Sequence, residues 1–438
     1  MPIENVDLAG RQGRLFQERL STELNKKHKL YKLRELINWS SLENEMLQMV
    51  NVSNLGRTRK SIRVLLGLSL LQSMYNFSDA LSSETLEENV YWQYFCGYEY
   101  GGTDIQVSES AIKRFRDSLG EKGHEIILKE LANVGLKVGS YKKKDLDSVI
   151  IDTTVQIKNI TYPHDAKLMC KARDEIVNLS HRQGFKLNNT YEKKYKRSLI
   201  QLWKYKLKSQ SKKRKKTLKH LKTLLGRLIR GFEKDVIKYA TNLSEKDKDI
   251  FARVQKIYTQ SCLDKNEKKE YKENGNKIMY SFHAEEVECI GKGKLNKPYE
   301  FGNKVAIAVS GKNNFIIGVK SFHGNPYDGH TLAQTVENIE KITDEEVNKI
   351  FVDLGYRGSN YSKKGKIYTP YTKKKLTKSD KKMQKRRSAV EPVIGHLKQH
   401  GRMGKNYLKG KVGDIVNPLL SAIGFNMRNL SKSVTAFT

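Results

Sequence analysis

The chain has 438 residues, of which 38% are hydrophobic, so it is long and apolar enough to fold into two or three domains. Lys and Arg number 82 against 48 Asp and Glu, which gives a formal net charge of +34. Because such an excess repels itself unless a polyanion neutralises it, nucleic acid is the expected partner, and an anionic membrane surface is the competing one.

No apolar run of transmembrane length and no apolar signal-type start are found, so a cytoplasmic protein with no membrane partner is expected. The four cysteines are far apart, and no CxxC pair or tight Cys/His cluster exists. The sequence therefore predicts reduced thiols and no structural zinc.

Residues 1–145 are predicted to form a helical N-terminal domain that binds DNA. The stretch "TRKSIRVLLGLSLLQSMY" is apolar around most of a helical circumference, which indicates a buried helix. The stretch "SESAIKRFRDSLG" has a candidate N-cap at Ser108 and a stop at Gly120. Its other face carries Lys113, Arg114 and Arg116. This face fits a DNA-reading helix of the helix-turn-helix kind, and it equally fits an ordinary solvated face.

Residues 146–438 are predicted to form an α/β or α+β domain, because short β-branched runs alternate with helical patterns. The run "SVIIDTTV" predicts a strand that ends at Asp152. The other expected strands are 278–283, 304–310, 315–323 and 349–355, and the expected helix between two of them is 328–342.

A very basic helical insertion is predicted within this domain, over residues 185–270. Leucines from Leu218 to Leu228 follow a 3, 4 spacing, which indicates an amphipathic helix that pairs with the preceding helix near Trp203. Trp203 is therefore expected between helices. The basic face of the insertion could contact DNA, contact anionic lipid or simply be solvated.

Three isolated carboxylates point to metal-dependent phosphodiester chemistry. Asp152 and Asp353 are expected at strand ends, and Glu391 is the one acid in the basic stretch "RRSAVEPVIGHLKQHGRMGKNYLKG". Hard oxygen ligands of this type bind Mg²⁺ or Mn²⁺. Each residue alone fits a cap, a turn or a salt bridge better. The combination in so basic a chain favours a metal site whose surroundings hold DNA.

These stretches resemble blocks of a known family. "IDTTVQIKNITYPHDAKL", "FVDLGYRG" and the stretch around Glu391 are similar to the three acidic blocks of the DDE transposases of bacterial insertion sequences. The resemblance to the IS-four/IS-five-type group covers nearly the whole chain. Arg387, Glu391 and Lys398 match the Arg-Glu-Lys spacing of its signature, whereas Gln384 stands where the signature has Tyr.

The resemblance implies an RNase H-like catalytic core and a nucleoid-associated enzyme. In that family Asp152, Asp353 and Glu391 would hold two Mg²⁺ or Mn²⁺ ions. The enzyme would cleave double-stranded DNA at the element ends and join the freed 3′-OH to target DNA. Arg387 and Lys398 would contact phosphates, and a homodimer would bring two ends together. A nuclease without strand transfer and a non-catalytic DNA-binding derivative are the alternatives.

Further residues around these blocks have two interpretations each. Arg357 contacts a phosphate or pairs with Asp353, and Arg402 is expected to contact DNA. Asp328 could support the metal site together with His330, but a helix-capping role is favoured for it. Pro392 predicts a kink, or a helix that starts near residue 391.

Overall fold

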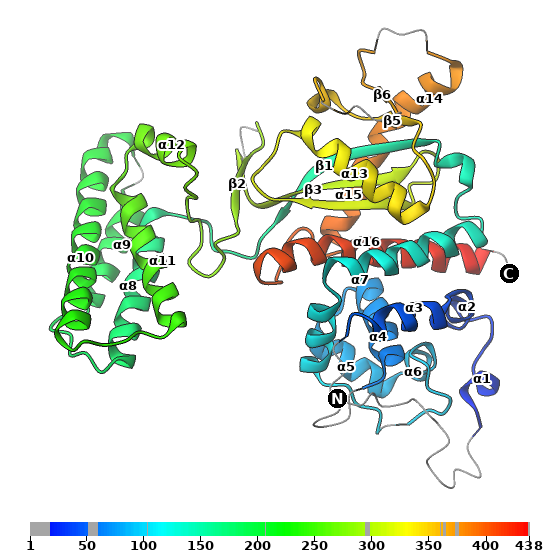
Figure 1. Ribbon diagram of the computed structural model, residues 1–438, viewed down its shortest axis with the longest axis horizontal. Coiled ribbons are helices and arrows are strands. Elements are labelled where there is room, and N and C mark those ends of the chain that lie inside the picture. The colour runs from blue at the N-terminus through cyan, green and yellow to red at the C-terminus, as the bar shows by residue number, and fades with distance from the viewer. Residues whose placement is uncertain are drawn as a thin grey trace. The chain divides into compact units, whose positions relative to one another are not determined.

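The structure is a computed structural model that describes residues 18–50, 60–102, 104–205, 207–293, 298–359, 361, 365–372 and 376–436. The chain divides into two compact units (Figure 1). The first unit comprises Met1–Asn159 and Ile290–Thr438, and the second comprises Ile160–Cys289. Among the described residues, no helix combines the length and the apolar character that crossing a membrane requires.

The first unit begins with helices, and two of them, α4 and α7, start close to the stretches where the sequence places helices. They are α1 (Leu20–Glu23), α2 (Lys29–Leu36), α3 (Trp39–Leu47), α4 (Ile62–Tyr75), α5 (Asp79–Glu88), α6 (Val90–Phe95) and α7 (Glu109–Lys137). Ser108 caps α7 by accepting a hydrogen bond from the Ala111 amide, as predicted. Gly120 takes non-helical backbone angles (φ 52°, ψ −150°), but the chain resumes helical geometry and continues to Lys137. The predicted stop is therefore a kink.

The sheet of this unit has six strands and mixed directions. They are β1 (Ser148–Ile157), β2 (Glu288–Gly291), β3 (Tyr299–Ser310), β4 (Ile316–Phe322), β5 (Lys349–Phe351) and β6 (Lys366–Tyr368). The hydrogen-bonded order is β2-β3-β1-β5-β6, and β4 also pairs with β3. β3 is antiparallel to β1 and β4, whereas β5 is parallel to β1 and β6. The observed class is a helix-rich α+β fold.

Two sequence predictions about strands are wrong. Residues 278–283 form no strand, because the backbone N–H and carbonyl of Met279 bond to the side chain of Gln260. Asp152 does not end its strand, since β1 runs on to Ile157 and Asp152 pairs with Ile307 of β3. The β-branched residues that follow Asp152 continue the strand.

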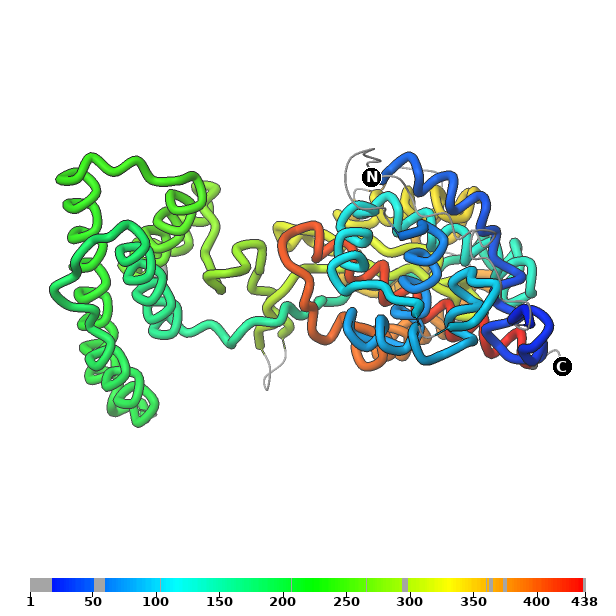
Figure 2. The backbone as a smooth tube through the Cα atoms, turned by 90° about the horizontal axis from the view of Figure 1, so that it is seen from below, coloured from blue at the N-terminus to red at the C-terminus, as the bar shows by residue number. Residues whose placement is uncertain are grey.

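Four further helices complete the first unit: α13 (Asp328–Thr343), α14 (Lys378–Arg386), α15 (Val390–Gln399) and α16 (Gly410–Ala436). α13 packs on β3 and β4, and α15 packs on β1 and β3. α16 packs along α2, α4, α7 and β4, and Figures 1 and 2 both show it beside α7. One apolar core therefore joins the N-terminal helices to the sheet, with Leu66, Leu128 and Ile307 among its fully buried members.

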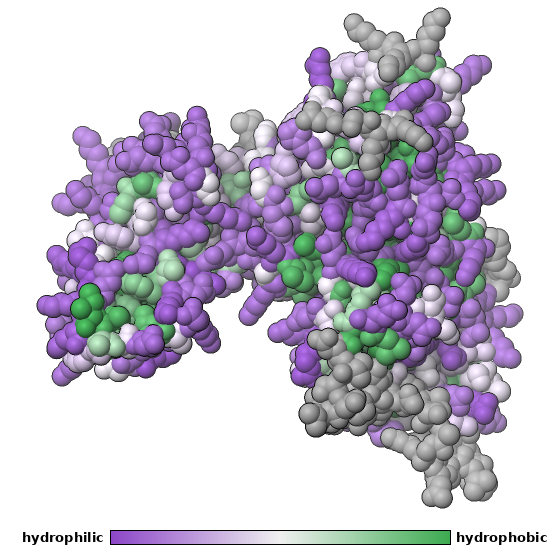
Figure 3. All heavy atoms as spheres, in the orientation of Figure 1, coloured by the Kyte–Doolittle hydropathy of each residue, from purple (hydrophilic) through white to green (hydrophobic). Residues whose placement is uncertain are grey.

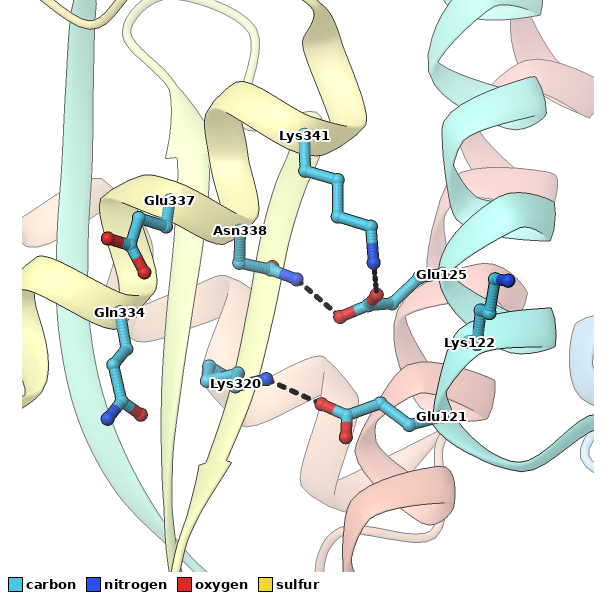
Figure 4. A pocket seen from close by; sticks show the side chains of 8 residues that line it. All are labelled: Glu121, Lys122, Glu125, Lys320, Gln334, Glu337, Asn338 and Lys341. Carbon is cyan, nitrogen blue, oxygen red and sulfur yellow. Dashed lines mark hydrogen bonds and ion pairs between the residues drawn. The ribbon is translucent and has the colours of Figure 1, made fainter.

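A cavity of about 520 Å³ lies where α7, α13 and β4 meet (Figure 4). Lys320 Nζ is 2.6 Å from Glu121 Oε1. Glu125 accepts a hydrogen bond from Asn338 Nδ2 at 2.8 Å and pairs with Lys341. Because these two acids are each paired, the cavity is a polar junction that ties α7 to the sheet.

The second unit is helical in its described residues, apart from the start of β2. Its helices are α8 (Asp165–Arg182), α9 (Glu192–Lys204), α10 (Ser211–Lys238), α11 (Glu245–Cys262) and α12 (Lys265–Glu273). Its apolar core is separate from that of the first unit and includes Leu221, Leu225 and Phe232 of α10. The prediction that Trp203 lies between helices is wrong, because its surface is 70% exposed.

Candidate active site

Strand pairing brings Asp152 and Asp353 together. β1 and β5 run parallel, with Ile150 opposite Phe351. Asp152 and Asp353 each lie two residues beyond these partners, so the same register places them side by side. The Thr153 amide donates to Asp152 Oδ1 at 2.8 Å, and the Gly355 amide donates to Asp353 Oδ1 at 2.8 Å.

A third carboxylate, that of Asp328 at the start of α13, lies at the same place. Asp328 Oδ1 accepts hydrogen bonds from Thr153 Oγ1 at 2.8 Å and from Lys304 Nζ at 2.9 Å. A Cβ added to Gly355 would lie 3.0 Å from both Asp328 Oδ2 and Asp353 Oδ1, so these two carboxylates flank that glycine. A side chain at residue 355 would therefore crowd the aspartates.

The surroundings of Asp152 change its acidity. Burial and the nearby Asp353 raise the pKa of Asp152 to about 7, although Arg387 opposes the rise. Burial and the carboxylates of Asp152 and Asp328 hold the pKa of Tyr356 well above its usual value. The Tyr356 phenol, with 1% of its surface exposed, therefore stays neutral beneath the acids.

The carboxylates of Asp152 and Asp353 suit a divalent cation, but these two residues alone do not make a complete metal site. Asp152 and Asp353 offer hard oxygen atoms whose mutual repulsion a bound cation would relieve. Within the described part of the chain, no three His, Cys, Asp or Glu side chains gather closely enough to form a metal site. Glu391 is exposed, and the helix that carries it, α15, packs on β1.

The helix that carries Glu391 starts where Pro392 predicts. A short 3-10 turn, Arg387–Ala389, separates α14 from α15, which begins at Val390. Pro392 thus lies in the first helical turn, where a missing N–H breaks no intrahelical bond. Arg387, on the 3-10 turn, acts electrostatically on Asp152. Gln384, at the Tyr position of the signature, donates to the Thr369 carbonyl at 2.6 Å.

Four of the predicted DNA-contacting residues line one open depression of about 1050 Å³. It lies between the start of α7 and the segment that follows α15. The four residues are Lys113, Arg116, Lys398 and Arg402. Residues more than 280 positions apart in the sequence thus share one surface, which sequence spacing could not reveal.

Arg116 and Arg402 have bonds within the protein that fix their side chains. Arg116 is 6% exposed, pairs with Asp79 and donates to Gln72 Oε1 at 3.2 Å. Arg402 donates to the Phe77 carbonyl and, at 3.1 Å, to Asn76 Oδ1. Both therefore hold the walls of the depression. Lys113 is exposed and Lys398 half-buried in that depression, whereas Arg114 and Arg357 are exposed outside its lining.

Comparison with known proteins gives matches in both halves of the sequence. A family described as "Transposase domain" matches residues 18–118, and one described as "Transposase DDE domain" matches residues 268–414. The second match includes Asp353 and Glu391, but Asp152 lies outside it. The chain is 30% identical over 191 residues to "Uncharacterized protein ORF8 in nfe locus" of Rhizobium meliloti. That alignment covers 44% of this chain and 91% of the relative.

The chain belongs to the DDE-type insertion-sequence transposases. The predicted resemblance to the DDE transposases is therefore confirmed. No solved structure matches this transposase.

The capping role that the sequence favours for Asp328 is wrong. The N-cap of α13 is Tyr327, and Asp328 instead accepts bonds from strands β1 and β3. The sequence does not predict its bond to Lys304, because nothing in the spacing of residues 304 and 328 indicates contact. His330 is exposed and packs edge-to-face against Tyr327, with ring centroids 5.6 Å apart.

Proposed function

We propose that this transposase cleaves DNA at the ends of its insertion sequence and joins the freed 3′-OH to target DNA. The observation that carries the proposal is the Asp152–Asp353 pair, which the β1–β5 register sets side by side and in which burial and the nearby Asp353 raise the pKa of Asp152. The segment that matches the transposase DDE domain contains both Asp353 and Glu391. We assign the catalytic roles to Asp152, Asp353 and Glu391.

The sheet supports an RNase H-like core. Antiparallel strands β4, β3 and β1 are followed across the sheet by β5 and β6, which run parallel to β1. In this proposal residues 146–438 form the catalytic domain, and the basic segment 185–270 interrupts it. Residues 1–145 form the domain that recognises DNA.

The chemistry follows from the residues around the pair. Two Mg²⁺ or Mn²⁺ ions, held by Asp152, Asp353 and Glu391, would supply charge stabilisation for in-line phosphodiester displacement. Burial and Asp353 raise the pKa of Asp152 to about 7, and bound cations would oppose that rise by favouring the ionised carboxylate. Thr153 and Gly355 fix the two carboxylates by backbone N–H bonds, and neutral Tyr356 adds no charge beneath them.

The basic residues are assigned to the DNA backbone. Arg387, beside Asp152, would hold a phosphate near the scissile bond. Lys113 and Lys398 line the same depression, so one duplex backbone would contact both. Arg114 and Arg357 are exposed and would extend these contacts. A homodimer would hold two element ends at once.

The test is cleavage of a plasmid that carries the gene with both flanking segments, in the presence of Mg²⁺ or Mn²⁺. The wild-type protein is expected to cut at the element ends and to join them to a target plasmid. Asp353→Asn and Glu391→Gln should each abolish both products. Glu84→Gln, an exposed acid-to-amide change on α5, is the matched control and should cut normally.

The other outcomes separate the rival functions. Cleavage without joined products would favour a nuclease that lacks strand transfer. End binding without cleavage by the wild-type protein would favour a non-catalytic DNA-binding protein. Normal cutting by Glu391→Gln would remove that residue from the catalytic set.

A further inference from the structure

The α9–α10 segment of the second unit has an extreme charge pattern. Residues 193–232 contain 16 Lys and Arg and no Asp or Glu. Figure 3 shows hydrophilic residues over much of the visible face of the unit formed by α8–α12. Such a segment bears strong self-repulsion in the absence of a partner.

The helix α10 separates its charge from its apolar side. Leu221, Leu225 and Phe232 point into the core and are fully buried. At 100° per residue, the opposite side carries an exposed stripe. We call it the α10 stripe, and its residues are Lys212, Lys216, Lys219, Arg227 and Arg230. With a rise of 1.5 Å per residue, it extends for about 27 Å along the helix.

In three other helices of the same unit, cations form ion pairs with acids of their own helix. Lys171 pairs with Glu175 in α8, and Arg253 pairs with Asp249 in α11. In α12, Lys269 pairs with Glu273. From Lys212 to Arg227 the positions one turn away along the α10 stripe carry cations or neutral residues instead, and like charges at this spacing destabilise a helix. Arg230 has Glu233 three positions further on. Among the described residues, no ion pair is recorded for any member of the stripe.

We propose that the α10 stripe binds the phosphate backbone of double-stranded DNA without reading its sequence. A length of about 27 Å corresponds to about eight base pairs of B-DNA at 3.4 Å per step. Lys and Arg side chains on one helix face could therefore meet several successive phosphates. The proposal rests on the proposed function only in taking DNA as the polyanion.

An anionic membrane fits the segment less well. Interfacial helices insert an apolar face beside their cations, but the apolar side of α10 is already used in the core. Ile200 and Trp203 of α9 are 56% and 70% exposed, so they are the residues that a membrane would engage. Vesicles are therefore the competing arm of the test.

The experiment measures binding of the full chain to a fluorescein-labelled duplex of unrelated sequence, in EDTA, across a series of salt concentrations. The test variant changes Lys212, Lys216, Lys219 and Arg227 to Gln. The control changes Lys246, Lys248, Lys269 and Lys272 to Gln, which removes the same charge from exposed positions where acids alternate with cations. Far-ultraviolet circular dichroism verifies that both variants keep their helices.

The test variant should reduce the magnitude of the negative slope of log K against log salt by about 3 to 4, because each phosphate contact contributes about −0.9. The control should change the slope by less than half as much. Equal slopes for both variants would overturn the proposal. So would loss of binding to phosphatidylserine vesicles with DNA binding unchanged, which would identify a membrane surface instead.

This measurement is independent of catalysis. Asp353→Asn should bind the unrelated duplex as the wild-type protein does, since EDTA excludes cleavage. Failure of the stripe variant to show weaker binding would leave the Asp152–Asp353 assignment untouched. Failure of Asp353→Asn to block cleavage would leave the stripe untouched.

Discussion

Asp328 joins three elements of the candidate site through one carboxylate. It starts α13 and accepts hydrogen bonds from Thr153 of β1 and Lys304 of β3. Its other oxygen lies beside Gly355, as does the Asp353 carboxylate. Asp328 is therefore a positioning residue, which fixes the two strands that carry and flank Asp152.

Asp328→Asn should weaken Mn²⁺ binding by roughly 10- to 100-fold, which is typical for loss of a residue that orients metal ligands. Isothermal titration calorimetry measures this directly, and the cleavage rate should fall in parallel. The control is Asp344→Asn, which removes an exposed carboxylate paired with Lys129. Unchanged Mn²⁺ affinity with a lowered melting temperature would show that Asp328 has a structural role only.

His124 of α7 provides a pH-dependent contribution to stability. It is fully buried, and burial lowers its pKa to about 4 although it bonds to the Gly120 carbonyl. The folded protein therefore resists protonation that the unfolded chain accepts near pH 6.5. Stability should be intact above pH 6.5 and should decline as the pH falls toward 4, by roughly 3 kcal/mol for this group.

Urea unfolding at a series of pH values checks this expectation. His124→Gln should flatten the decline between pH 6.5 and 4, whereas His330→Gln at an exposed position should leave it unchanged. If His124→Gln retained the full acid dependence, other groups would be responsible for it.

At the scale of elements, the contact between α4 and α16 depends on a glycine. A Cβ added to Gly424 would lie 2.1 Å from the Ser73 carbonyl oxygen, so the two helices could not keep their separation. Gly424→Ala should therefore destabilise the first unit by roughly 1–3 kcal/mol, the range for overpacking. Thermal unfolding measures the change.

The matched control is Gly231→Ala in α10, where an added Cβ meets nothing within 4 Å. This change should stabilise the protein by roughly 0.4–1 kcal/mol, because alanine reduces the entropy of the unfolded chain. A Gly424→Ala protein as stable as Gly231→Ala would show that α16 shifts freely along α4.

Elements differ in how far the sequence predicts them. α4 and the start of α7 were predictable because apolar periodicity and the Ser108 cap act locally. The apolar pattern of residues 278–283 predicts a strand, but it does not indicate what the backbone bonds to. In the structure the N–H and carbonyl of Met279 bond to the side chain of Gln260 rather than to another strand. The site is harder still. The sequence indicates Asp152 and Asp353 as candidates, but only the β1–β5 register places them side by side. The hydrogen bond between Lys304 and Asp328 likewise depends on the tertiary fold, which the sequence pattern does not indicate.

At the scale of the whole molecule, two separate apolar cores predict two unfolding transitions. The core of the first unit includes Phe95, and that of the second includes Phe232. Both side chains are fully buried, so each Phe→Ala change should cost roughly 3–5 kcal/mol in its own unit. Differential scanning calorimetry should show Phe232→Ala lowering one transition temperature and Phe95→Ala lowering the other.

The two variants can be compared directly, because Phe95→Ala and Phe232→Ala each remove one buried phenyl ring from an apolar core. If each variant lowered a single common transition, the two units would unfold together and the separation of their cores would have no thermodynamic consequence. If the transitions respond separately, the effect of the α10 stripe on DNA binding can be measured in variants whose catalytic unit keeps its own melting temperature. An unchanged melting temperature of the first unit would then show that a change in DNA binding arises in the second unit.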